Sequence, residues 1–250
     1  MRMKMGLILA LCLMGANAGG EKKPSTSETS ERFVQEVIER TNAERVKQGV
    51  SPLKQQPALT QAARWLAQDM ATKNYFEHTD RQGRDIDARL PAFDYTNWRN
   101  IGENIAAGQR TPAAVVAGWM KSPGHRANIL SPQFREIGVG YAAGRGHLKT
   151  YWVQDFGSRA DVYPLVINNE AAQTRSPNVR LYLHGKEWAE EMRLSNDGTN
   201  WTEWQPFEAR TNWTLPTRPG ERTVFAELRR GDRVLSAQDS IQLLPASARP

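Results

Sequence analysis

Apolar residues recur at helical spacing in three segments of the first half of the chain. The first segment ends at Gly49, the second opens with Pro57, and the third opens with Thr111 as an N-cap followed by Pro112. Proline is well tolerated in the first turn of a helix, and glycine commonly follows a helix end. We therefore predict three helices. Their inward-facing residues are Phe33, Val34, Val37 and Ile38; Leu59, Ala62, Ala63, Leu66 and Met70; and Val115, Val116 and Trp119.

The pattern then changes from helical spacing to alternation. Ile137, Val139 and Tyr141 alternate with small residues, a Gly-Arg-Gly turn follows, and residues 148–156 return as a second strand. Helices followed by a hairpin, rather than helices and strands in strict alternation, indicate an α+β domain. We place this domain at residues 31–160.

The remainder of the chain predicts strands only. Short alternating segments are separated by the turn signals Asn196-Asp197-Gly198 and Arg230-Gly231-Asp232. Strands and turns at this spacing are typical of a small β-sandwich, which we place at residues 178–245. Residues 161–177 are then the expected hinge. The predicted fold is an α+β domain followed by a small all-β sandwich.

The first residues have the pattern of a targeting segment. Arg2 and Lys4 precede an apolar run, and Ala16-Asn17-Ala18 resembles a cleavage site, so residues 1–18 are predicted to be a signal peptide. Residues 19–30 are predicted to be a flexible linker. The single cysteine, Cys12, lies in the signal peptide, so the processed chain would have no disulfide. We expect an exported protein, secreted or periplasmic.

Composition narrows the functional classes. The formal net charge is +6, yet lysine and arginine form no stripe and are not interleaved with aromatic residues, so we do not expect nucleic acid as a partner. Beyond the short apolar run at the start, no segment has the length of a transmembrane span. The expected partner is a small ligand or a component of the cell envelope.

Three residues stand out as candidate chemistry. His78, Glu103 and His125 are a sensible ligand set for a divalent metal such as zinc, because imidazole and carboxylate suit this ion and a fourth position stays open. The same groups could act as general acid and base, with Glu103 as the catalytic residue. Their spacing does not choose between these roles, because the residues are far apart in the sequence.

These residues lie in segments that resemble the CAP superfamily, the cysteine-rich secretory, antigen 5 and pathogenesis-related proteins. The resemblance covers roughly residues 31–156 and is closest to the cysteine-free bacterial branch. It is carried by Tyr75-Phe76-Glu77-His78, Ile101-Gly102-Glu103-Asn104-Ile105-Ala106, Ser122-Pro123-Gly124-His125 and Glu136-Ile137-Gly138-Val139-Gly140, with Thr41-Asn42-Ala43-Glu44-Arg45 and Trp119 in addition. The later run Glu191–Gly198, followed by Trp201 and Trp204, resembles an immunoglobulin-like or fibronectin-like module.

The CAP resemblance implies an α-β-α sandwich and a cleft lined by two histidines and two acidic residues. His78, Glu103 and His125 occupy three of these positions, but Ser122 stands at the fourth. Glu136 is acidic and near in sequence without being at that position, so we include Glu136 and Ser122 only as further cleft candidates. The implied tetrad is thereby reduced to a triad.

Three functions follow from these residues. The first is a secreted binding module whose cleft holds a divalent metal or a small ligand. The second is a metal-assisted hydrolase acting on peptide or envelope polymer, a role that the missing carboxylate weakens. The third is a structural or adhesive envelope protein without a small ligand.

Overall fold

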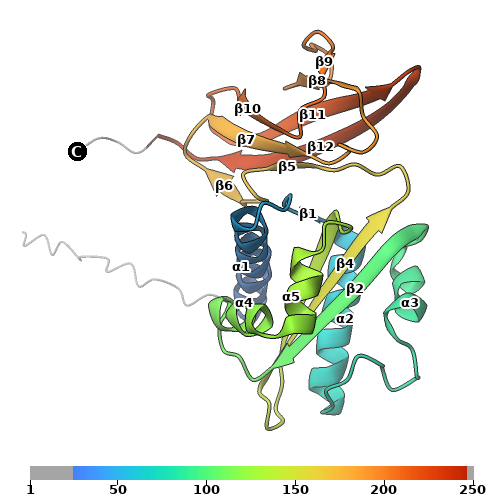
Figure 1. Ribbon diagram of the computed structural model, residues 1–250. Helices are drawn as coiled ribbons and strands as arrows, with labels where there is room; N and C mark the ends of the chain where they lie inside the picture. Colours follow the sequence, from blue (N-terminus) through green and yellow to red (C-terminus); the bar gives the residue numbers. More distant parts are fainter. Residues whose placement is uncertain (1–24, 247–250) are drawn as a thin grey trace, which may run out of the picture.

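The computed structural model describes residues 25–246. The predicted signal peptide, residues 1–18, lies outside the described residues, as do residues 19–24 of the predicted linker. The described part consists of an N-terminal domain up to Arg159 and a C-terminal module of strands (Figure 1). None of the helices in residues 25–246 is both long and apolar enough to cross a bilayer.

Helix α1 begins earlier than the sequence pattern suggests. It spans Thr26–Lys47, so residues 26–30 are helical and not a linker. The reason is local: the Ser25 hydroxyl accepts a hydrogen bond from the Glu28 N–H at 3.2 Å, and the Glu28 carboxylate accepts one from the Ser25 N–H at 2.7 Å. This capping box satisfies two backbone donors at the helix start. The polar composition that suggested a linker is the composition of an N-terminal helical turn.

A four-stranded sheet with the strand order β1-β3-β4-β2 forms the middle of the N-terminal domain. The strands are β1 (Lys54–Gln55), β2 (Trp98–Ala107), β3 (Glu136–Ala143) and β4 (Thr150–Arg159). Strand β1 pairs with β3 in parallel, and the other pairs are antiparallel. Strand β2 is therefore an edge strand, and this edge carries the candidate site.

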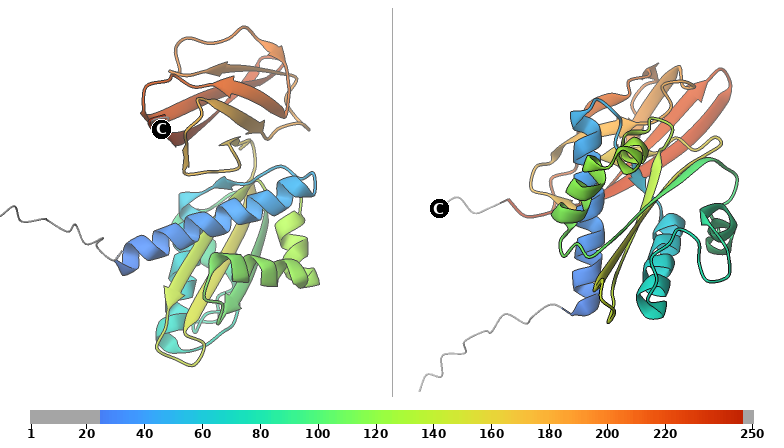
Figure 2. Two further views of the ribbon diagram at one scale, coloured as in Figure 1. Left: turned by 90° about the vertical axis from the view of Figure 1, so that its left-hand side faces the viewer. Right: turned by 60° about the horizontal axis from the view of Figure 1, so that its bottom comes forward.

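Helices cover both faces of this sheet, as the α-β-α prediction requires (Figures 1 and 2). One face carries α2 (Pro57–Lys73), the short α3 (Ile86–Arg89) and the 3-10 turn η1 (Leu90–Phe93). The other face carries α1, α4 (Pro112–Lys121) and α5 (Pro123–Leu130). Helix α2 lies against β3 at backbone distance: a Cβ added to Gly140 would stand 2.2 Å from the Ala63 carbonyl oxygen. Only glycine permits this approach.

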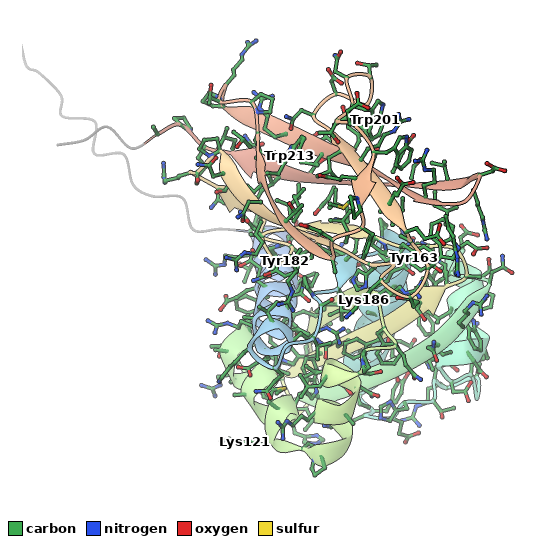
Figure 3. The ribbon with its side chains drawn as sticks, turned by 45° about the horizontal axis from the view of Figure 1, so that its top comes forward. Lys121, Tyr163, Tyr182, Lys186, Trp201 and Trp213 are labelled. Atoms are coloured by element: carbon green, nitrogen blue, oxygen red, sulfur yellow. The ribbon has the colours of Figure 1, made fainter. Side chains whose placement is uncertain are left out.

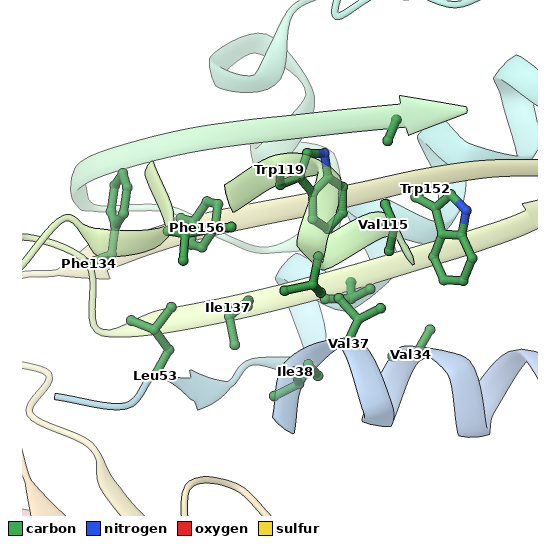
Figure 4. Close-up of a cluster of buried hydrophobic side chains, with 14 residues drawn as sticks. Val34, Val37, Ile38, Leu53, Val115, Trp119, Phe134, Ile137, Trp152 and Phe156 are labelled. Carbon is green, nitrogen blue, oxygen red and sulfur yellow. The ribbon is translucent and has the colours of Figure 1, made fainter. Parts of the chain in front are cut away.

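The main core of the domain lies between the sheet and the α1, α4 and α5 layer (Figure 4). Trp119 and Trp152 are its largest side chains, and both are almost completely buried. The predicted inward-facing residues of α1 and α4 are confirmed here, namely Val34, Val37, Ile38, Val115, Val116 and Trp119. Those of α2 lie buried on the opposite face of the sheet.

The C-terminal module is a two-sheet sandwich. A three-stranded sheet has the order β10-β7-β5 and a five-stranded sheet has the order β6-β12-β11-β8-β9, and their apolar residues form one core between them. The strands are β5 (Leu165–Ile167), β6 (Gln173–Thr174), β7 (Asn178–Leu183), β8 (Glu191–Ser195), β9 (Gln205–Pro206), β10 (Arg210–Thr214), β11 (Gly220–Arg230) and β12 (Arg233–Leu243).

The segment predicted to be a hinge contributes to this sandwich. Residues 161–177 contain β6 and β5; all three β5 residues are buried, and Leu165 and Ile167 belong to the module core. The connection is also fixed to the first domain, because the Lys54 ammonium lies 2.5 Å from Glu170 and 2.6 Å from Asp239. Residues 161–177 are therefore an ordered part of the domain junction. The hinge prediction failed because a short buried strand has too few residues to show alternation.

Candidate functional site

His78 and Glu103 form a direct pair. His78 lies in the loop after α2, and Glu103 lies on the edge strand β2. Nδ1 of His78 donates to Oε1 of Glu103 at 2.7 Å. The two side chains differ in exposure, with 54% of His78 and 4% of Glu103 accessible to solvent. A buried carboxylate thus orients an exposed imidazole, and Nε2 of His78 has no hydrogen-bond partner among residues 25–246.

Arg89 completes this pair from the buried side. Its guanidinium contacts the second oxygen of Glu103 through Nη2 and donates from Nη1 to the His78 carbonyl oxygen at 2.6 Å. Only 2% of the Arg89 side chain is exposed. The guanidinium therefore holds both the carboxylate and the loop that carries His78. Sequence reasoning missed Arg89, which lies in none of the family segments.

A second carboxyl group stands next to Glu103. Asp155 is its cross-strand neighbour on β4 and is fully buried. Burial and the charge of Glu103 raise the pKa of Asp155 well above its usual range. The sequence marks Asp155 only as an aspartate within a segment whose other residues are typical of a buried strand.

His125 and Ser122 reach the site from the other face of the sheet. Ser122 joins α4 to α5 at the N-cap position of α5, and its side chain makes no capping hydrogen bond there. His125 lies in the first turn of α5. Partial burial and the nearby His78 charge lower the pKa of His125. The tertiary structure thus brings the two histidines around the edge of β2.

These groups line one cleft with a volume of about 500 Å³. His78, His125 and Ser122 provide its polar groups, whereas Ile105, Ala106, Val115 and Trp119 provide apolar surface. Glu103 is not among the lining residues, and it affects the cleft by orienting the His78 ring. The cleft therefore combines two imidazoles with an apolar wall.

Side chains from α4 and α5 fix the strand edge beside the cleft. Trp119 donates from Nε1 to the Ile105 carbonyl oxygen at 3.2 Å, and Asn128 donates to the Glu103 carbonyl oxygen at 3.2 Å. Exposed strand edges are otherwise free to pair with other strands. These two bonds hold both helices against β2 and so set the position of His125.

Glu136 belongs to a different network. It lies on β3, where its carboxylate accepts hydrogen bonds from Tyr95 at 2.8 Å and from Arg159 at 2.6 Å. It does not line the cleft. Arg159 is therefore the arginine partner of Glu136.

The triad does not fit a metal ion in this arrangement. Both oxygens of Glu103 are already engaged, one by His78 and one by Arg89. Among residues 25–246, no group of three or more His, Cys, Asp or Glu side chains is placed to hold a metal. Zinc binding by His78, Glu103 and His125 stays a prediction.

Comparisons with known proteins fit this architecture. Residues 38–156 match the CAP cysteine-rich secretory protein family. The uncharacterized protein YkwD of Bacillus subtilis is 45% identical over 125 residues, which are 50% of this chain and 46% of YkwD. The uncharacterized membrane protein YlbC of the same organism is 30% identical over 139 residues, which are 56% of this chain and 37% of YlbC. The chain therefore spans less than half the length of these two relatives.

Two solved structures match part of the chain. An extracellular protein containing a SCP domain from Bacillus anthracis is 27% identical, with a TM-score of 0.49, and the match covers 55% of this chain and 45% of that protein. A cysteine-rich secretory protein from Staphylococcus aureus is 18% identical, with a TM-score of 0.42, covering 57% of this chain and 44% of that protein.

Proposed function

Because residues 38–156 form a CAP domain, we propose that this protein is an exported binding protein whose ligand occupies the cleft between His78 and His125. The predicted signal peptide and the extracellular B. anthracis protein support export. The two imidazoles beside an apolar wall support binding of a ligand with an apolar body and a hydrogen-bonding head group. The cleft is the observation that carries this proposal.

The chemistry of the two histidines favours binding. Glu103 accepts from Nδ1 of His78, so in the neutral ring Nε2 is an acceptor, whereas a protonated ring offers a second donor. The pKa of His125 is lowered by burial and by His78, which favours a neutral ring. Glu103 is engaged by Arg89 and is not free to serve as a base. The cleft residues therefore suit recognition of a polar head group better than the Glu103-based hydrolysis considered above.

A steric block tests this proposal. A Cβ added to Gly118, which lines the cleft, meets no atom within 4 Å, so Gly118→Leu fills the cleft without a clash at its first atom. Gly124 has equally open surroundings and is not among the lining residues, so Gly124→Leu is the matched control. Decanoate and an N-acetylated alanine tripeptide amide serve as probes. The imidazole resonances of His78 and His125 are followed by NMR in histidine-labelled protein.

We expect at least one probe to shift both imidazole resonances in the wild type and in Gly124→Leu, but not in Gly118→Leu. Equal shifts in the two variants, or no shift with either probe, would overturn the proposal. Calorimetry with zinc chloride, on the wild type and on the double variant His78→Ala, His125→Ala, tests the metal prediction separately. Negligible heat from both proteins would exclude zinc as the ligand.

A hydrolase remains the second candidate, because one geometric feature favours it. A carboxylate that accepts a hydrogen bond from Nδ1 of a histidine orients that ring as a general base. The Ser122 hydroxyl, which makes no capping hydrogen bond, lines the same cleft. In this form His78, and not Glu103, would be the base. Turnover of p-nitrophenyl esters that disappears in His78→Gln would support it, and no turnover in the wild type would argue against it.

A further inference from the structure

A second cavity lies between the N-terminal domain and the C-terminal module. Its volume is about 480 Å³. The N-terminal domain contributes residues from the end of α1, from β2 and from the loop before β3, and the module contributes the segment after β7. Figure 3 shows Lys186 of this segment where the module faces the N-terminal domain. The cleft between His78 and His125 shares none of these residues.

The charges around this cavity are strongly unbalanced. Arg45, Arg99, Arg135 and Lys186 line it, and Glu187 is the one carboxylate among the lining residues. Glu187 is engaged by Arg135. In the described part of the chain, neither Arg99 nor Lys186 forms an ion pair, and both residues are exposed. Two cationic groups are therefore available to a ligand.

The buried wall adds a further uncompensated charge. Arg45 is fully buried, and within residues 25–246 its guanidinium donates only to carbonyl oxygens, among them Ile129 at 2.7 Å and Ser131 at 2.8 Å. A buried cation without a carboxylate projects its field into the neighbouring cavity, because low-dielectric surroundings screen it weakly. Burying a cation without a carboxylate partner costs free energy, and here the buried cation lies at a position that faces the cavity.

His184 also lines this cavity and lies close enough to Arg45 and Arg135 to be affected by their charges. It is buried, and its Nε2 lies 2.8 Å from the Pro52 carbonyl oxygen, to which it donates. The pKa of His184 is lowered to about 4, mainly by burial and also by the charges of Arg45 and Arg135, against the opposing effect of the Pro52 bond. Arg45 and Arg135 both act on this wall with the sign of charge that an anion requires.

We propose that this cavity is an anion-binding site for a small phosphoryl compound, held by Arg99 and Lys186 over the Arg45 wall. A phosphoryl group fits because guanidinium groups bind its oxygens in a bidentate manner, and lysine adds a point charge. Ser51, Asn100 and Gln133 also line the cavity and can donate hydrogen bonds to such a group. The site is independent of the cleft function proposed above.

Calorimetry on the full chain at low ionic strength tests this site. Inorganic phosphate and glycerol 3-phosphate are the soluble probes, and vesicles containing phosphatidylglycerol present the same chemistry on a lipid headgroup. The site variant is the double substitution Arg99→Ala, Lys186→Ala. The matched control is Arg145→Ala, Arg218→Ala, which removes two charges from exposed turn residues that line neither cavity.

We expect the wild type and the control to bind at least one soluble probe, and the site variant to bind it about tenfold or more weakly, the loss expected for charged hydrogen bonds. Binding should also weaken with added salt. Equal affinities in the two double variants would overturn the proposal. Binding to vesicles alone, with no heat from either soluble probe, would overturn it as well.

Discussion

Glu103 accepts a hydrogen bond from Nδ1 of His78 at 2.7 Å, although 25 residues separate them in the chain. The pair joins a loop to an edge strand. Arg89 fixes it from the buried side, through contacts with Glu103 and with the His78 carbonyl oxygen. The exposed imidazole is thereby held in one orientation beside the cleft. The stability of the domain and the geometry of its candidate site consequently depend on the same buried ion pair.

Arg89→Ala should destabilise the protein strongly. Glu103 would remain buried at 4% exposure without its guanidinium partner. Removing one member of a buried ion pair costs about 3–5 kcal/mol. Urea unfolding of the two proteins would measure this loss in the free energy of unfolding. Arg40→Ala is the control, since Arg40 forms an exposed pair with Glu36 and should cost no more than about 0.5 kcal/mol. Equal losses would contradict the assigned role.

Two glycine substitutions should change stability in opposite directions. Gly140→Ala places a methyl group 2.2 Å from the Ala63 carbonyl oxygen and must push α2 from β3, at a cost of about 1–3 kcal/mol or more. Gly118→Ala, inside α4, meets nothing within 4 Å and should raise the free energy of unfolding by about 0.5–1 kcal/mol. Thermal unfolding of both variants checks the signs, and a stabilising Gly140→Ala would refute the close packing.

The domain junction should be more stable in mild acid because of Glu170. Burial and the neighbouring Asp239 raise the pKa of Glu170 from 4.5 to about 7, against the opposing charge of Lys54. The folded protein then holds this proton more tightly than the unfolded chain. The resulting stabilisation is complete below pH 4.5 and is lost as the pH rises through 7.

Glu170→Gln should remove this pH dependence. We expect the difference in unfolding free energy between wild type and variant to change by roughly 1–3 kcal/mol between pH 5 and pH 8. Urea unfolding at several pH values measures this difference. Glu203→Gln, on an exposed residue, is the control and should run parallel to the wild type. Parallel curves for Glu170→Gln would contradict the assignment.

His184 should make the protein less stable in acid, which is opposite to the effect of Glu170. Its pKa is lowered from 6.5 to about 4, with burial as the largest cause. The unfolded chain therefore binds this proton first, so stability is full above pH 6.5 and is lost as the pH falls through 4. We expect His184→Gln to flatten the acid limb of the stability curve, measured by urea unfolding between pH 4 and pH 7. His147→Gln, at an exposed residue, should leave that limb unchanged.

The sequence by itself determined the α+β order, the helix faces and the strand hairpin. These features depend on local periodicity: Val34, Val37 and Ile38 repeat at helical spacing, and Ile137 and Val139 alternate, so each pattern shows in a single segment. The family resemblance rests on ordered short segments and brought His78, Glu103 and His125 forward together. Residues 38–156 match the CAP cysteine-rich secretory protein family, and the shared role of these three residues stays a prediction.

Only the tertiary structure decided what surrounds those residues. Arg89 and Asp155 meet Glu103 through a loop closure and a strand pairing, and Glu136 is drawn away to Tyr95 and Arg159. The positively charged cavity likewise exists only where two separate modules meet. Such contacts join residues distant in sequence, so they depend on how whole elements pack and leave no periodic signal in the chain. The candidate chemistry was therefore visible in the sequence, but its partners were not.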